Sequence, residues 1–283
     1  MKYILSLSCP DRPGIVHAVS GFLLELGANI VEAAQFDDAT TGIFFMRIAF
    51  ELDKDRYMDA CHIQERFEPL VAQWGMRARI HDSKQKPKTF IMVSQHGHCL
   101  NDLLFRWRSG LLPIDLRGIV SNHRDFESLS SNYGLRFHHI PVTVSTKHQA
   151  ERCLLDVFDT EGGELLVLAR YMQVLSDDIC TRLSEKAINI HHSFLPSFKG
   201  ARPYQQAHER GVKLIGATAH YVTPELDEGP IIEQDVVRAS HSMDAVALTA
   251  LGRDVESAVL SRAVKWHVEH RVLLNGAKTV VFR

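Results

Sequence analysis

The amino-acid sequence predicts an α/β protein with two domains, the first in the order βαββαβ and the second on a mostly parallel sheet. Its 283 residues are enough for two hydrophobic cores. Through residues 1–82, apolar residues recur with the spacing of strands and of helices in turn. Residues 83–88 are polar, include a proline and show no such spacing. From residue 89, short apolar runs alternate with helical segments. We therefore expect domains at 1–82 and 89–283, with a linker at 83–88.

The first domain shows two kinds of spacing in turn. Apolar residues alternate in the strand-like segments and recur every three or four residues in the helical ones, and Gly27 is placed to end the first helix. The order βαββαβ is the ferredoxin-like split βαβ. The expected strands are 3–8, 29–36, 42–50 and 76–81, and the expected helices are 15–26 and 55–74.

The first domain resembles the ACT domain, a small-molecule sensing module, in residues 11–16 and 26–30. The resemblance implies an amino-acid effector such as glycine or methionine, and a homodimer or homotetramer formed through this domain. It places the effector where the first strand-to-helix loop meets the second strand, at Gly14, Ile15, Asn29 and Ile30. Gly14 would let a ligand approach the backbone closely. The alternative is that Pro13-Gly14 only starts a helix.

The second domain alternates apolar runs with helical segments, which favours a parallel sheet covered by helices on both faces. Such sheets carry their sites at the carboxyl ends of the strands. Asn189 and His191 come directly after the apolar pair Ala187-Ile188, so they lie at the carboxyl end of a predicted strand, where a site is expected. The expected strands are 89–93, 114–121, 135–140 and 164–168, and the expected helices are 98–109, 124–132, 147–159 and 176–185.

Asn189, His191 and Asp227 are the candidate catalytic residues. Positions two apart on a strand face the same side, so the amide of Asn189 and the imidazole of His191 point together. An amide can hold an oxyanion, an imidazole can move a proton at neutral pH, and a carboxylate can hold a water or orient the imidazole. These groups suit acyl transfer without a covalent enzyme intermediate.

Residues 187–234 resemble the formyltransferase-fold family, whose members move or release the formyl group of 10-formyltetrahydrofolate. The family motif Asn-x-His matches Asn189 and His191, its strand histidine matches His220, and its aspartate matches Asp227. The resemblance implies a Rossmann-like domain. His220 lies on an apolar strand, which favours a supporting rather than a reacting role. Residues 168–176 resemble the family's folate-binding loop, which implies that Arg170, Met172 and Val174 line the pterin pocket through side chain or backbone.

The acceptor of the formyl group separates two branches of this family. Transformylases of glycinamide ribonucleotide carry a Gly-rich loop after the first strand that cradles phosphate, and residues 93–102 contain one glycine, two histidines and an aspartate instead. An ACT domain before a formyltransferase domain resembles the hydrolytic branch, as do residues 200–207 and 216–222. The resemblance implies that water attacks 10-formyltetrahydrofolate and releases formate and tetrahydrofolate. It also implies that the enzyme supplies formate for purine synthesis and balances the one-carbon pools. Transfer to an amine such as glycinamide ribonucleotide and a non-enzymatic sensor are the alternatives.

Composition excludes other classes of function. The net charge is −2 with scattered basic residues, so we expect no nucleic-acid partner. No apolar run approaches the roughly 18 residues that span a bilayer. The five cysteines form no C-x-x-C pair, which favours a reducing cytoplasm over disulfides or a zinc cluster. We expect neither cofactor nor metal.

Overall fold

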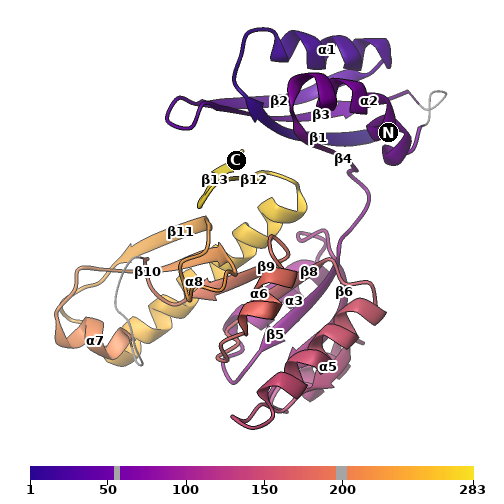
Figure 1. Cartoon of the computed structure of the whole chain (residues 1–283). Helices are drawn as coiled ribbons and strands as arrows, with labels where there is room; N and C mark the ends of the chain where they lie inside the picture. Colours follow the sequence, from indigo (N-terminus) through magenta and orange to yellow (C-terminus); the bar gives the residue numbers. More distant parts are fainter. Residues whose placement is uncertain (54–57, 196–202) are drawn as a thin grey trace. The chain divides into compact units, whose positions relative to one another are not determined.

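The computed structural model describes residues 1–53, 58–195 and 203–283, and these form two compact units (Figure 1). One unit consists of Met1–Lys86 together with Glu269–Arg283, and the other of Pro87–Val268. Residues 269–283 are expected from the sequence in the second domain, but they pack with the first. The block 200–207, and the start of the helix expected at 55, lie partly outside the described residues.

The first unit has the βαββαβ order that the sequence predicts. Its antiparallel sheet has the strand order β2-β3-β1-β4. Figure 1 shows both helices on one face of this sheet. Asp59 begins α2 by accepting a hydrogen bond from the His62 N–H at 2.7 Å, and Gly75 ends it at a φ of 62°. The elements are β1 (Lys2–Pro10), α1 (Ile15–Glu25), β2 (Asn29–Asp38), β3 (Ile43–Glu51), α2 (Ala60–Trp74) and β4 (Arg77–Asp82).

The core of this unit lies between the helices and the sheet. Val19, Phe22 and Leu23 recur on one side of α1 and are buried, as the spacing predicts. Phe22 meets Phe67 of α2 edge to face, with ring centroids 4.9 Å apart. This apolar layer leaves the opposite face of the sheet for another segment of the chain.

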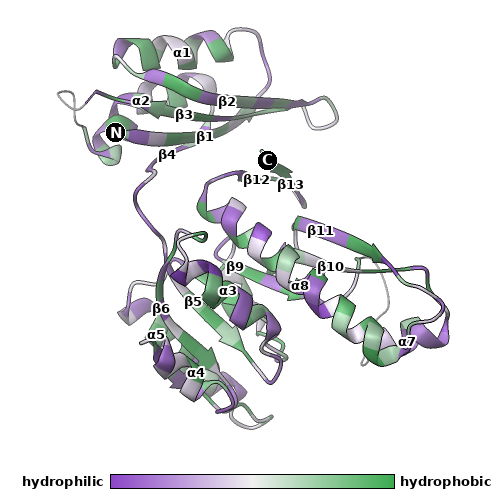
Figure 2. Cartoon of the chain, turned by 180° about the vertical axis from the view of Figure 1, so that it is seen from behind, coloured by the Kyte–Doolittle hydropathy of each residue, from purple (hydrophilic) through white to green (hydrophobic). Residues whose placement is uncertain are grey.

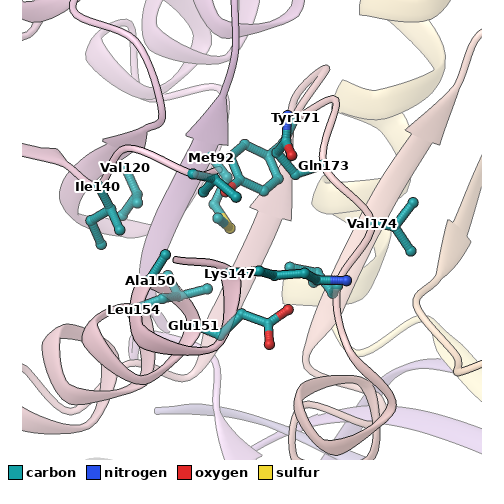
Figure 3. A pocket seen from close by; sticks show the side chains of 12 residues that line it. Met92, Val120, Ile140, Lys147, Ala150, Glu151, Leu154, Tyr171, Gln173 and Val174 are labelled. Atoms are coloured by element: carbon teal, nitrogen blue, oxygen red, sulfur yellow. The ribbon is translucent and has the colours of Figure 1, made fainter. Parts of the chain in front are cut away.

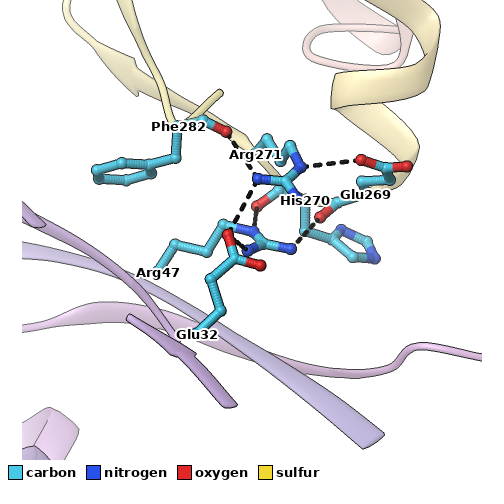
Figure 4. Close-up of polar contacts among 6 residues, drawn as sticks. All are labelled: Glu32, Arg47, Glu269, His270, Arg271 and Phe282. Carbon is cyan, nitrogen blue, oxygen red and sulfur yellow. Dashed lines mark hydrogen bonds and ion pairs between the residues drawn. The ribbon is translucent and has the colours of Figure 1, made fainter. Parts of the chain in front are cut away.

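Residues 269–283 are held to the first unit by Arg47, whose side chain is only 3% exposed (Figure 4). Arg47 of β3 donates hydrogen bonds to the carbonyls of Glu269 and His270 at 3.1 and 3.2 Å. It also pairs with the Glu32 carboxylate at 3.0 Å. A buried guanidinium requires such partners, so the docked segment satisfies a cation that β3 could not otherwise bury.

Arg271 strengthens the same attachment. Its guanidinium pairs with Glu32 at 3.1 Å and donates to the Phe282 carbonyl at 3.1 Å. The imidazole of His270 stacks on His81 of β4, with ring centroids 3.5 Å apart. The segment itself is a hairpin of β12 (Val272–Asn275) and β13 (Lys278–Val281). Polar contacts and one ring stack therefore explain why the sequence pattern alone places this segment in the other domain.

The second unit is built on a sheet with the strand order β11-β10-β9-β8-β5-β6-β7. The strands from β9 to β7 run parallel, and β10 and β11 are antiparallel additions, which confirms the predicted mostly parallel sheet. Figure 2 shows the hydrophobic residues of the central strand β5. The strands are β5 (Lys88–Val93), β6 (Asp115–Ser121), β7 (Arg136–His139), β8 (Leu165–Leu168), β9 (Ala187–His191), β10 (Leu214–Tyr221) and β11 (Ile231–Arg238).

The chain order reverses between β5 and β8, since β6 lies on one side of β5 and β8 on the other. Carboxyl ends of parallel strands on either side of such a switch are the usual place for a site. Most of the helices are predicted from the sequence, but α7 and α8 are not. The helices are α3 (His98–Arg108), α4 (Glu127–Asn132), α5 (Lys147–Thr160), α6 (Asp177–Arg182), α7 (Pro203–Glu209) and α8 (Ala245–Val268).

The helix α8 packs against β9, β10 and β11 and against α3. Its buried positions include Gly252, Glu256 and Leu260, each one turn from the next. Among the described residues, no helix combines the length and the apolar character that crossing a membrane would need.

Candidate active site

Asn189 and His220 form a cross-strand pair, because β9 and β10 run antiparallel with these two residues in register. The Asn189 Nδ2 lies 3.3 Å from the His220 Nε2. The His220 Nδ1 lies 2.9 Å from the Tyr221 carbonyl, so Nδ1 carries the proton and Nε2 of the neutral ring accepts from the amide. His220 thus sets which way the Asn189 amide points and leaves its second N–H for another acceptor.

His191 and Asp227 form the second pair of the site. The His191 Nδ1 lies 3.1 Å from the Asp227 Oδ2, and the other carboxylate oxygen, Oδ1, lies 3.7 Å from the His220 Nε2. Burial would raise the pKa of Asp227, but its hydrogen bond with His191 outweighs this and holds that pKa well below its usual range. The carboxylate is therefore ionised at neutral pH and fixes the proton of His191 on Nδ1, which leaves Nε2 without a proton.

The loop that carries Asp227 between β10 and β11 is tightly placed. Asp227 has a φ of 59°, a conformation that few non-glycine residues adopt. Two residues later, a Cβ on Gly229 would lie 1.7 Å from the Tyr221 carbonyl oxygen, so only glycine fits there. The Tyr221 N–H also donates to the Pro230 carbonyl at 3.0 Å. These contacts bring Asp227 to the carboxyl end of β9.

The structure thus brings together Asn189, His191, His220 and Asp227. An amide N–H, an imidazole nitrogen and a carboxylate converge where a carbonyl group and a water could meet. That set can hold an oxyanion, take a proton from water and return it to a leaving nitrogen.

The loop after β8 contains the three residues that the sequence analysis assigns to a pterin pocket. Arg170 is mostly buried and has a φ of 66°, and its carbonyl accepts a hydrogen bond from the Ser94 N–H at 3.2 Å. The Met172 N–H donates to the Ser94 Oγ at 3.0 Å. The side chains of Met172 and Val174 are exposed. Ser94, at the end of β5, therefore sets the shape of this loop.

A pocket lies against the same loop (Figure 3). Tyr171, Gln173 and Val174 contribute to it from the loop, and Lys147 and Glu151 from α5. The Glu151 carboxylate accepts a hydrogen bond from the Ser176 N–H at 2.8 Å, which ties α5 to the start of α6. Burial raises the pKa of Tyr171 to about 12, so its phenol stays protonated. Of the three residues assigned from sequence, Val174 lines this pocket.

Arg170 faces Glu256 of α8, a residue that the sequence analysis does not single out. The Arg170 Nε lies 3.4 Å from the Glu256 Oε2, and the His98 Nε2 lies 2.7 Å from the same oxygen. A carboxylate on the apolar side of a helix, one turn from Gly252 and from Leu260, is a signal that could have identified Glu256. Removing the Glu256 carboxylate from water costs free energy, and the interactions with its partners must offset that cost.

Glu256 and two residues near it carry side chains of the types that bind metal ions. Ligand atoms of His98, Cys99 and Glu256 lie within 4.8 Å of one another. The cationic Arg170 beside Glu256 disfavours a second cation. Burial, followed by the Glu256 charge, raises the pKa of the Cys99 thiol, which disfavours the thiolate that a metal requires. The chemistry of these donors therefore fits a metal poorly.

The first unit contains a pocket at the loop between β1 and α1. Gly14 and Ile15 line it together with Arg12, whose guanidinium lies 4.4 Å from the centroid of the Trp74 ring. Gly14 has a φ of 100°, and a Cβ there would lie 3.1 Å from Trp74. The other two expected effector residues, Asn29 and Ile30, are exposed at the start of β2 and are not among the lining residues.

Comparisons with known proteins agree with both units. Residues 87–264 match the family model for formyl transferase, and residues 3–56 match that for the ACT domain. Formyltetrahydrofolate deformylase of Corynebacterium sp. (strain P-1) is 52% identical over 100% of this chain and 99% of the relative. The chain belongs to the formyltetrahydrofolate deformylase family. This confirms the resemblance found in the sequence.

Solved structures of this family agree as closely. The crystal structure of formyltetrahydrofolate deformylase from Burkholderia mallei matches with a TM-score of 0.95 and 53% identity, covering 100% of this chain and 99% of that one. Glycinamide ribonucleotide transformylase 1 from Symbiobacterium toebii is more distant, with a TM-score of 0.66 and 25% identity over 72% of this chain and 97% of that one. The transformylase branch is thus a remote relation of this deformylase family member.

Proposed function

We propose that this protein hydrolyses 10-formyltetrahydrofolate to formate and tetrahydrofolate. The observation that carries the proposal is the convergence of Asn189, His191 and Asp227 at the carboxyl end of β9. The family membership supports it independently, since relatives that match over nearly their whole length bear the name of this activity.

In the proposed mechanism, the oxygen of a water attacks the formyl carbon while His191 takes a proton from that water at Nε2. The Asp227 carboxylate, 3.1 Å from Nδ1, holds the imidazole in the required tautomer and stabilises its charged form. The formyl oxygen becomes an oxyanion and accepts the Asn189 N–H that His220 leaves free. One such donor contributes on the order of 3–4 kcal/mol to the transition state.

The intermediate then collapses to formate as the bond from carbon to N10 breaks. The proton on His191 Nε2 passes to the departing nitrogen, which leaves as the amine of tetrahydrofolate, and the imidazole returns to its neutral form. Positioned proton transfer of this kind typically contributes about 10²–10⁴-fold. We propose that these residues act without a metal or cofactor, and that Met172 and Val174 contact the folate at the loop after β8.

We also propose that the first unit senses an amino acid such as glycine or methionine and that the protein assembles as a dimer or tetramer through this unit. The match to the ACT domain and the pocket at Gly14 support a sensing role. Regulation is expected of an enzyme that releases one-carbon units as formate. The five free cysteines support a cytoplasmic location.

Formate release from 10-formyltetrahydrofolate tests the proposed function, with purified protein, no amine acceptor and a chelator present. We expect formate and tetrahydrofolate in equal amounts. Turnover that appears only after addition of glycinamide ribonucleotide would assign the protein to the transformylases instead. Activity that the chelator abolishes would contradict the metal-independent mechanism.

A further inference from the structure

Tyr221 follows His220 on β10, and its backbone holds two parts of the proposed catalytic site. The Tyr221 carbonyl oxygen lies 2.9 Å from the His220 Nδ1 and accepts a hydrogen bond from it. The Tyr221 N–H donates to the Pro230 carbonyl at 3.0 Å, which holds the end of the loop that carries Asp227. A shift of this backbone would therefore disturb the carboxylate of Asp227 and also the amide of Asn189, which His220 orients.

The side chain of Tyr221 is anchored on α8. Its hydroxyl lies 2.7 Å from the His267 Nδ1, in the last turn of that helix, and the two rings meet edge to face. Burial, followed by the charge of Glu185, raises the pKa of Tyr221, so the phenol keeps its proton and can donate it to the imidazole. A buried hydroxyl requires a hydrogen-bond partner, and His267 provides it. His267 therefore fixes the outer end of the Tyr221 side chain.

His267 lies just before the segment that packs with the first unit. Val268 is buried and ends α8, and the carbonyls of Glu269 and His270 accept hydrogen bonds from the buried Arg47 (Figure 4). His270 has a φ of 53°, which few non-glycine residues adopt and which persists only where neighbouring contacts enforce it. The chain between the two anchored positions therefore has little freedom to absorb a displacement.

We propose that His267 is a positioning residue, and that through Tyr221 it makes the geometry of the catalytic residues depend on the attachment of residues 269–283 to the first unit. The inference rests on the proposed function. While Arg47 holds this segment, the last turn of α8 holds the Tyr221 hydroxyl, and the Tyr221 backbone holds the site. Once the segment is released, the end of α8 frays and this support is lost. The first unit thereby sets the rate of hydrolysis through the chain itself.

Steady-state formate release by the full-length protein tests this inference, with each rate divided by the number of tetrahydrofolate-binding sites found by titration. Loss of folded protein removes binding sites but leaves the rate per site unchanged, whereas misplaced catalytic groups lower kcat per site at an unchanged KM. Tyr221→Phe and His267→Phe each remove the hydrogen bond and keep a ring. Tyr133→Phe is the matched control, because Tyr133 contacts Trp107 and Arg108 through its ring.

Tyr221→Phe and His267→Phe are each expected to lower kcat per site about tenfold, which is the order of one buried hydrogen bond, and Tyr133→Phe should match wild type. A folded Tyr221→Phe or His267→Phe as fast as wild type would overturn the inference.

A double-mutant cycle of Tyr221→Phe with Arg47→Leu tests the connection to the first unit. Arg47→Leu alone should also lower kcat per site, and the double variant should be no slower than the slower single variant. An unchanged rate in Arg47→Leu, or fold-changes that multiply in the double variant, would overturn the inference. If Arg47→Leu does not fold, Arg271→Gln takes its place, because Arg271 is less buried and holds the same segment to Glu32.

Hydrogen exchange separates this inference from the proposed function, because it requires no turnover. In Arg47→Leu, the amides of residues 219–230 should exchange faster together with those of 269–283, and in Tyr133→Phe neither range should change. Faster exchange confined to 269–283 would overturn the inference. Wild type that releases no formate would overturn the proposed function alone, since the exchange measurement still decides whether the two ranges are coupled.

Discussion

The His191 Nδ1 lies 3.1 Å from the Asp227 Oδ2, although one residue ends β9 and the other belongs to the loop after β10. The antiparallel pairing of β9 with β10 brings the two together, because it places Asn189 opposite His220 and turns the following loop back over the end of β9. The catalytic proposal depends on this contact.

Asp227→Asn is expected to abolish formate release while largely sparing folate binding. The amide keeps the size of the carboxylate but cannot stabilise a charged His191, and the loss should be on the order of 10²–10⁴-fold in kcat. Formate release and equilibrium binding of tetrahydrofolate measure the two effects separately. Asp235→Asn, an exposed aspartate paired with Arg262, is the control. Near-normal hydrolysis in Asp227→Asn would disprove the mechanism.

Gly229→Ala is expected to reduce kcat without altering a reacting group. The added Cβ would lie 1.7 Å from the Tyr221 carbonyl oxygen, so the loop must shift and move Asp227 away from His191. A displacement of about 1 Å can cost on the order of 10²-fold in rate. Gly21→Ala serves as the control, since a Cβ there meets nothing within 4 Å. If steady-state kinetics show both variants equally active, the loop does not position Asp227.

Arg47→Leu is expected to release residues 269–283 from the first unit. The substitution removes the hydrogen bonds from Arg47 to the Glu269 and His270 carbonyls. It also removes one of the two arginines that pair with Glu32 and leaves Arg271 as the other. Loss of a buried charged partner typically costs about 3–5 kcal/mol. Hydrogen exchange of residues 269–283 should accelerate in this variant and not in Arg79→Leu, an exposed arginine on β4 of the same sheet. Unchanged exchange would show that Arg47 does not hold the segment.

Acid is expected to destabilise the first unit through His81. Burial, with a smaller effect of Arg79, lowers the pKa of His81 to about 4 from an ordinary value of 6.5. The unfolded chain therefore binds more protons between these values, so the free energy of unfolding falls as pH drops from 6.5 towards 4. His81→Phe keeps an aromatic ring against His270 but cannot bind a proton. The fall in the free energy of unfolding should therefore be smaller in this variant by on the order of 2–3 kcal/mol.

Urea unfolding of the first unit at pH 7 and pH 4.5 measures this difference. His62→Phe is the control, because His62 is exposed on α2. An equally large acid loss in His81→Phe and in wild type would place the acid sensitivity on other groups.

Gly14→Val is expected to abolish a response to glycine or methionine while leaving basal formate release intact. Gly14 has a φ of 100°, which a β-branched residue tolerates poorly, and its Cβ would press against Trp74 at 3.1 Å. Formate release with and without each amino acid compares the variant with wild type. A wild-type rate that neither amino acid changes would contradict the choice of effector, and a response retained in Gly14→Val would place the effector elsewhere.

Local patterns in the sequence are sufficient for the order of strands and helices along the first unit and for most of the elements of the second. Strands such as β1 and β5 are short apolar segments bounded by turn residues, so their periodicity identifies them. The helix α8 was missed, since its buried side includes Gly252 and Glu256 and the apolar pattern is interrupted there.

Residue types at fixed spacing along the chain are enough to identify the two-domain order, the family and the candidate catalytic set of Asn189, His191 and Asp227. The contact of Arg170 with Glu256 and the packing of residues 269–283 with the first unit become visible only in the folded chain. Both depend on buried charges that find partners far away in sequence. Such partners are set by how strands and helices pack, and no local periodicity records them.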